Sequence, residues 1–70
     1  MVKNRLYWDD AYPIAQRLQR AHSQADPIDV DLAVLREWVL QLPEFADDPT
    51  LAQLTMLEDI QREWIDLFKE

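Results

Sequence analysis

The stretch TLAQLTMLEDIQREWIDLF, residues 50–68, decides the fold because its apolar residues return every three or four positions. That spacing places them along one side of an α-helix. The predicted apolar face consists of Leu51, Leu54, Leu57, Ile60, Trp64, Ile65 and Phe68. We therefore expect residues 50–68 to form the longest helix of the chain.

Two shorter helices are predicted upstream, over about residues 10–22 and 32–42. Pro13 is tolerated because it falls in the first turn of its helix, where a backbone N–H is not needed. Asp31 is the expected N-cap of the next helix, and Pro43 ends it. Asp-Pro steps at 26–27 and 48–49 mark the connections, and Ile28 with Val30 is expected to form a short extended piece.

Three tryptophans are the expected anchors of the core. A chain of 70 residues buries a modest core, so its stability rests on a few large side chains. Trp38 and Trp64 lie on predicted apolar faces, whereas Trp8 precedes the first helix and is expected to pack there or to stay partly exposed. The sequence predicts one all-α domain over residues 5–70, with three main helices and long acidic connections.

The charge is −7 overall and is concentrated in the middle of the chain. Residues 26–48 contain one base, Arg36, and seven acids: Asp26, Asp29, Asp31, Glu37, Glu44, Asp47 and Asp48. Such a segment repels the phosphates of nucleic acids, which proteins bind largely through Lys and Arg. It favours a basic protein surface or a hard cation.

Other classes of protein are disfavoured by what the sequence lacks. There is no cysteine for a disulfide, a thiolate metal site or a Cys nucleophile. No apolar run approaches the roughly 20 residues of a membrane span, and the N-terminus does not resemble a signal peptide. His22 is the only histidine, and no hydroxyl has an evident base nearby. We expect a soluble, cytoplasmic protein that is not an enzyme and does not bind membranes.

Adjacent acids in the predicted loops are the candidate site residues. Asp47 and Asp48, with Glu44 nearby, offer the oxygen ligands that hard cations prefer, or charge that attracts a basic partner. The alternative is that Asp47 and Asp48 only cap a turn before Pro49. For Asp26, which precedes Pro27, the alternative to a contact role is that it only marks the boundary between a helix and a loop. Glu58 is expected to pair with Arg62 four residues later.

The chain resembles the IscX family of small acidic accessory proteins in bacterial iron–sulfur cluster assembly. The resemblance covers roughly residues 6–66. Its first half consists of Trp8, Asp10, Ile14, Leu18, Asp26-Pro27, Val30, Trp38 and Leu42. Its second half consists of Phe45, Asp47-Asp48-Pro49, Leu57-Glu58, Ile60 and Trp64.

This resemblance implies a winged-helix-like fold that has lost nucleic-acid binding. It implies docking on a basic surface of the cysteine desulfurase, weak iron binding by surface carboxylates, and modulation of cluster formation without catalysis. Relatives carry acids on the first helix where this chain has Pro13, Gln16 and Arg20, which moves the expected site toward other carboxylates.

We therefore expect a monomer without a tightly bound cofactor. The residues predicted to contact the desulfurase are Asp9, Asp10, Asp26, Asp29, Glu44, Asp47 and Asp48. Weak Fe²⁺ binding is predicted at Asp10, Asp47 and Asp48. The alternative function is a winged-helix-like DNA-associated regulator or a nucleic-acid mimic, although the second helix offers it only Arg36 beside Glu37.

Overall fold

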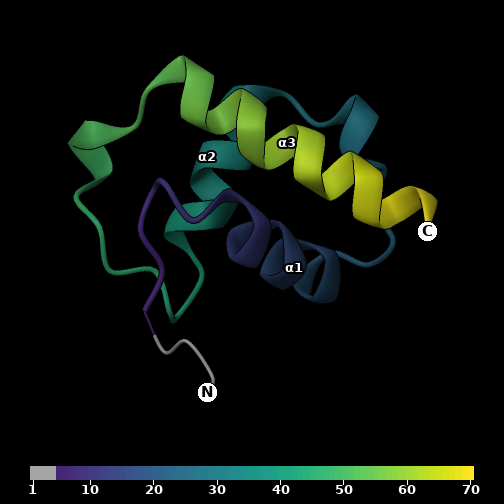
Figure 1. The fold of residues 1–70 in the computed structure, drawn as a ribbon, viewed down its shortest axis with the longest axis horizontal. Coiled ribbons are helices and arrows are strands. Elements are labelled where there is room, and N and C mark those ends of the chain that lie inside the picture. Colours follow the sequence, from purple (N-terminus) through teal and green to yellow (C-terminus); the bar gives the residue numbers. More distant parts are fainter. Residues whose placement is uncertain (1–4) are drawn as a thin grey trace.

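The computed structural model describes residues 5–70 and is built from helices (Figure 1). The three α-helices are α1 (Ala11–Ala21), α2 (Leu32–Leu40) and α3 (Leu54–Lys69). Two short 3₁₀ helices, η1 (Pro27–Asp29) and η2 (Pro49–Leu51), lie in the connections. Residues 5–70 contain no strand, only an isolated parallel bridge between Leu6 and Phe45. The all-α prediction is confirmed, and the winged-helix part of it is not.

The longest helix, α3, crosses both other helices and buries one side against them (Figure 1). Leu57, Ile60 and Trp64 are its buried residues, as the apolar spacing predicted. They join a core that contains Leu6, Trp8, Ile14, Ala15, Leu18, Leu35, Val39 and Leu42. Within residues 5–70, no helix combines the length and the hydropathy that a bilayer crossing requires.

Both ends of the predicted apolar face of α3 were assigned wrongly. The helix begins at Leu54, because Pro49–Leu51 forms η2 and Ala52 and Gln53 then have extended backbone. Leu51 and Leu54 therefore remain 56% and 62% exposed, and Phe68, near the C-terminus, remains 40% exposed. Spacing alone could not show that the partner helices cover only the middle of this stretch.

The connection between α1 and α2 is also different from its prediction. Ile28 does not belong to an extended piece, because it lies in η1. Asp26 Oδ1 accepts a hydrogen bond from Ile28 N at 3.0 Å, and Pro27 takes the first helical position, where no N–H is needed. Asp31 stands at the N-cap of α2 as expected, but its side chain makes no capping bond.

The three tryptophans are buried to different degrees. Trp64 is fully buried, and its Nε1 donates to Gln19 Oε1 at 2.8 Å, which joins α3 to α1. Trp38 is half-buried between the Trp64 ring and the imidazole of His22, which stacks on it at 3.9 Å. Trp8 is 1% exposed, so of the two alternatives predicted for it the packed one holds.

The residues before α1 lie along the loop after α2 (Figure 1). Leu6 N donates to Glu44 O at 2.9 Å, and Ala46 N donates to Leu6 O at 2.9 Å. The Leu6 side chain is fully buried, so burial and backbone pairing hold the segment in the same place. This pairing brings the acids at positions 9 and 10 toward those at 47 and 48.

Candidate partner-binding site

The site is built around Trp8. Its indole Nε1 donates to Asp48 O at 2.7 Å, and its ring meets Phe45 edge-on at 4.6 Å. Trp8 and its neighbours line an open pocket of about 400 Å³. The other lining residues are Tyr7, Asp9, Asp47, Leu51 and Met56. We call the surface formed by Tyr7, Asp9, Asp47, Asp48 and Leu51 the Trp8 edge.

Asp47 holds the two segments of this edge together. Its Oδ2 accepts a hydrogen bond from Trp8 N at 2.9 Å, and its Oδ1 accepts one from Asp48 N at 2.7 Å. Both donors are neutral backbone groups, and within residues 5–70 no Lys or Arg forms an ion pair with it. The turn-capping interpretation of Asp47 is thus correct, and its negative charge is still available to a partner.

Asp48 is held at the start of η2 by the residue two positions later. Its Oδ1 accepts hydrogen bonds from Thr50 N at 2.9 Å and from Thr50 Oγ1 at 2.8 Å. These bonds, the backbone one first, favour the ionised carboxylate and lower its pKa below the ordinary value of 3.8. The exposed carboxylate therefore stays ionised near neutral pH.

We expect Asp48→Asn to be less stable than the parent at pH 7 by a few degrees in the unfolding midpoint. The pKa of Asp48 is lower in the folded chain than its ordinary value, so its stabilising effect is complete above about pH 4 and is lost as the pH falls through the folded pKa. Thermal unfolding between pH 2 and 7 measures this difference. It should disappear at the acid end, and Asp29→Asn, at an exposed carboxylate without a hydrogen bond within residues 5–70, should show none. A constant difference across the range would contradict the assignment.

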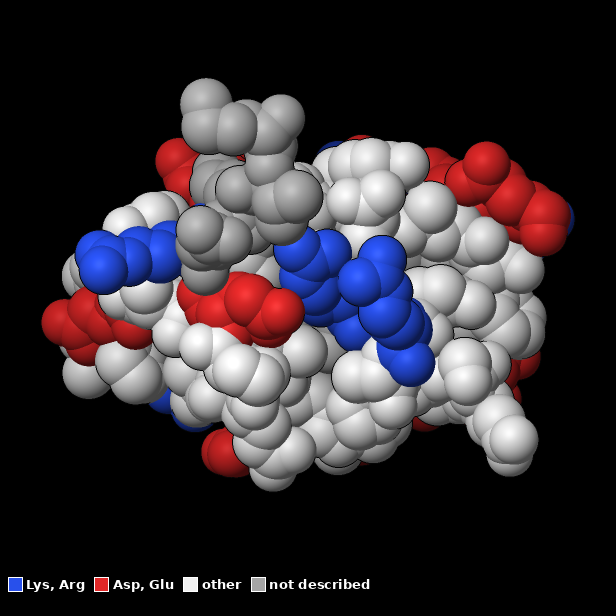
Figure 2. Space-filling model, turned by 90° about the horizontal axis from the view of Figure 1, so that it is seen from below, with Lys and Arg blue, Asp and Glu red and all other residues white. Residues whose placement is uncertain are grey.

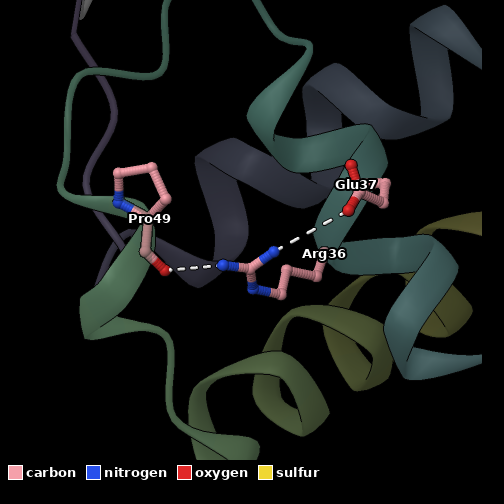
Figure 3. A network of polar contacts seen from close by, with 3 residues as sticks. All are labelled: Arg36, Glu37 and Pro49. Atoms are coloured by element: carbon pink, nitrogen blue, oxygen red, sulfur yellow. Dashed lines mark hydrogen bonds and ion pairs between the residues drawn. The ribbon is translucent and has the colours of Figure 1, made fainter.

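The single base of the acidic middle contacts Pro49 and Glu37 (Figure 3). Arg36 Nη2 donates to Pro49 O at 3.0 Å, and its Nη1 lies 3.8 Å from Glu37 Oε1. The first contact ties α2 to η2 and so steadies the Trp8 edge. Because Arg36 contacts a carbonyl and Glu37, it does not neutralise Asp47 or Asp48.

The other predicted site residues have different surroundings. Asp10 stands at the N-cap position of α1, but its Oδ2 accepts a hydrogen bond from Tyr7 N at 3.0 Å and its side chain makes no capping bond to the helix. Glu44 Oε2 lies 3.4 Å from Arg17 Nε, which partly offsets its charge. Asp9 is exposed and has no ion pair within residues 5–70.

Asp26 and Asp29 lie apart from the Trp8 edge. Asp26 is the N-cap residue of η1 and Asp29 is its last residue, and η1 lies on the right in Figure 1, whereas residues 44–51 lie on the left. Gln61 of α3 holds η1 in place, because its Nε2 donates to both Pro27 O and Val30 O at 2.9 Å. Asp26 and Asp29 therefore form an acidic area separate from the Trp8 edge, and Glu44, which is paired with Arg17, belongs to neither.

The expected carboxylate set for Fe²⁺ is not arranged as a ligand cage. Among residues 5–70, no three acids, histidines or cysteines are grouped so that they could hold a metal ion. Asp10, Asp47 and Asp48 each accept backbone hydrogen bonds instead. The Fe²⁺ site at these residues stays a prediction.

Sequence reasoning missed two residues that build the site, Leu6 and Leu51, and one that holds η1, Gln61, and it misplaced one ion pair. Leu6 and Gln61 are fastening residues, and Leu51 is an apolar part of the edge rather than of the core. Gln61 lies four residues after Leu57 on the apolar side of α3, and a polar residue at such a position indicates a buried hydrogen bond. Arg62 Nη2 bonds Asp59 Oδ1 at 2.8 Å, so the expected pair of Arg62 with Glu58 is wrong.

Comparison with known proteins gives matches that cover most of the chain. The profile of a family described as "Iron-sulphur cluster assembly" matches residues 6–69. An uncharacterized protein of Pseudomonas aeruginosa is 43% identical over 61 residues, which are 87% of this chain and 92% of that protein.

Proposed function

This chain belongs to the iron–sulphur cluster assembly family, which confirms its resemblance to the IscX proteins, and we propose that within cluster assembly it docks on a cysteine desulfurase through the Trp8 edge. The membership means that the chain takes part in iron–sulphur cluster assembly. The desulfurase as partner, the docking surface and the modulating role are the proposal. The two proteins would meet in the cytoplasm.

The observation that carries this proposal is a set of carboxylates that form no ion pair within residues 5–70. They are Asp9, Asp47 and Asp48, and backbone hydrogen bonds hold the last two in position. Preorganised charges of one sign steer an oppositely charged protein into contact and raise its association rate. The exposed side chains of Tyr7 and Leu51 add apolar contact beside the charge.

Docking of this kind modulates cluster assembly because the protein occupies a surface of the desulfurase. A protein seated on a basic surface near the desulfurase active site hinders other components that use the same surface. The chain needs no catalytic group for this role, and docking by charge does not depend on bound Fe²⁺.

The first test is the salt dependence of desulfurase binding. Exposed charges are screened over about 8 Å at physiological ionic strength, so affinity should fall about tenfold or more between 50 and 500 mM NaCl. Calorimetric titration of the desulfurase with this protein gives both dissociation constants. Equal affinities at the two salt concentrations would contradict charge-led docking.

A matched pair of charge reversals then locates the surface. Asp9→Lys at the Trp8 edge should weaken desulfurase binding by about fivefold, mainly through a slower association rate. Asp29→Lys makes the same charge change on η1 and should have a much smaller effect. Both side chains are exposed and neither forms an ion pair within residues 5–70, so folding should be unaffected. The reverse ranking would move docking to η1.

A further inference from the structure

A small basic area lies on this acidic protein, away from the carboxylates of the Trp8 edge. Figure 2, seen from below Figure 1, shows Lys and Arg side chains together on the face where α1 lies, with an acidic side chain beside them. Arg17 and Arg20 come from α1 and line a pocket of about 200 Å³. Ala21, Leu42, Pro43 and Glu44 complete its walls.

Arg17 is mostly buried but poorly satisfied. Its side chain is 18% exposed, and Nε has no hydrogen-bond partner within residues 5–70. Its one polar contact there is the ion pair with Glu44, whose Oε2 lies 3.4 Å from Nε without forming a hydrogen bond. A guanidinium has five N–H donors, and burying them without acceptors is unfavourable. Only Nε is both buried and without a partner, and the other N–H groups of this pocket-lining guanidinium, which form no hydrogen bond within residues 5–70, are the donors available to an acceptor that enters the pocket.

Arg20 provides a second guanidinium at the same pocket. It is exposed and has neither a hydrogen bond nor an ion pair within residues 5–70. It also lines the adjoining hollow of about 320 Å³ with Gln16, Gln19 and Leu67, so it stands between two depressions on the same side of α1. Two arginines against Glu44 leave the pocket with a positive balance.

We propose that this pocket receives the carboxylate of an acidic segment of a protein partner. Guanidinium and carboxylate groups match in shape and form paired, charge-assisted hydrogen bonds. Ala21, Leu42 and Pro43 offer apolar walls to the methylene groups of a glutamate side chain. A free phosphate lacks such groups, and its double charge is repelled more strongly by a chain of net charge −7.

This pocket is independent of desulfurase docking and would let the protein hold partners of opposite charge on two faces. Glu44 takes part in the control of the pocket, because its carboxylate competes with the incoming one for Arg17. Removing that competitor should strengthen binding at the pocket, whereas the loss of an acid should not strengthen docking on a basic desulfurase.

Titration by heteronuclear NMR tests the proposal. The probe is an acetylated, amidated hexapeptide with two adjacent glutamates between leucines, and its counterpart carries glutamines instead. The glutamate peptide should give saturable shifts in the side-chain Nε–H signals of Arg17 and Arg20 and in the amides of Ala21 and Glu44, with a dissociation constant of about 1 mM. The glutamine peptide should give no saturation. The absence of saturation with the glutamate peptide would overturn the proposal.

Three variants and one further anion sharpen the test. Arg20→Gln should weaken peptide binding about threefold to tenfold, Glu44→Gln should strengthen it, and Arg62→Gln, the same charge change on exposed α3, should leave it unchanged. An equal loss with Arg62→Gln would show unspecific attraction. Saturation by inorganic phosphate at equal or lower concentration would overturn the assignment to an acidic segment. Desulfurase binding measured on the same variants distinguishes peptide binding at this pocket from docking at the Trp8 edge.

Discussion

Trp64→Ala is expected to remove a large part of the free energy of unfolding of the protein at 25 °C. Trp64 is fully buried, packs against Trp38, and donates from Nε1 to Gln19 Oε1. Truncation of a buried tryptophan to alanine costs about 3–5 kcal/mol. A chain of this size has a total stability of roughly 4–10 kcal/mol, so much of it would be lost. Urea unfolding followed by far-ultraviolet circular dichroism measures the effect.

Two control variants on the same helix separate the effect of burial from other effects of the substitution. Trp64→Phe keeps an aromatic ring but loses the bond to Gln19, so it should cost less, about 1–2 kcal/mol. Phe68→Ala removes an aromatic side chain that is 40% exposed and should cost about 0.5 kcal/mol or less. If Phe68→Ala destabilised as much as Trp64→Ala, the end of α3 would have to be packed.

Gln61→Glu is expected to cost about 2–3 kcal/mol at pH 7, because it leaves an ionised group facing acceptors. The native Nε2 donates to Pro27 O and Val30 O, both at 2.9 Å, and the side chain is part-buried. A glutamate of nearly the same shape would place a carboxylate oxygen against these carbonyl oxygens. The variant should also loosen η1 from α3.

The pH dependence of this variant identifies the cause. The carbonyl oxygens and partial burial would raise the pKa of the introduced carboxyl above its unfolded value. The penalty is then absent below the unfolded pKa and grows as the pH rises through the folded pKa. Urea unfolding from pH 3 to 8 should show the gap to the parent widening with pH. Gln61→Leu, which cannot titrate, should show a constant gap; the same constant gap for Gln61→Glu would contradict the proposed contact.

The middle of α3 was predictable from the sequence, and its ends were not. Leu57, Ile60 and Trp64 follow helical spacing and are buried, because burial needs only that one side of a helix be apolar. Leu54 and Phe68 follow the same spacing and are exposed. Their exposure depends on how far α1 and α2 extend beneath α3, and spacing along one helix carries no information about the length of another.

The candidate site was predictable in its chemistry but not in its arrangement. The acids were recognised one by one, and Asp47 with Asp48 was the leading pair. That Asp9 shares a pocket with Asp47, while Asp29 lies on η1, depends on contacts between residues about 40 positions apart. The same holds for Gln61, whose amide bonds carbonyls more than 30 positions away.

The sequence by itself determined the helical class, the three helices, the helix-breaking prolines and the excess of negative charge. These follow from local rules, since spacing, proline geometry and charge act over a few residues. Only the tertiary structure decided that Leu6 and Trp8 pack beside the loop after α2, and that Asp26 and Asp29 lie apart from the Trp8 edge. It also decided that Arg17 is mostly buried without a hydrogen bond from Nε within residues 5–70. The physical reason is that charge and hydrogen-bonding groups are neutralised by their neighbours in space, and those neighbours are chosen by the packing of the whole chain.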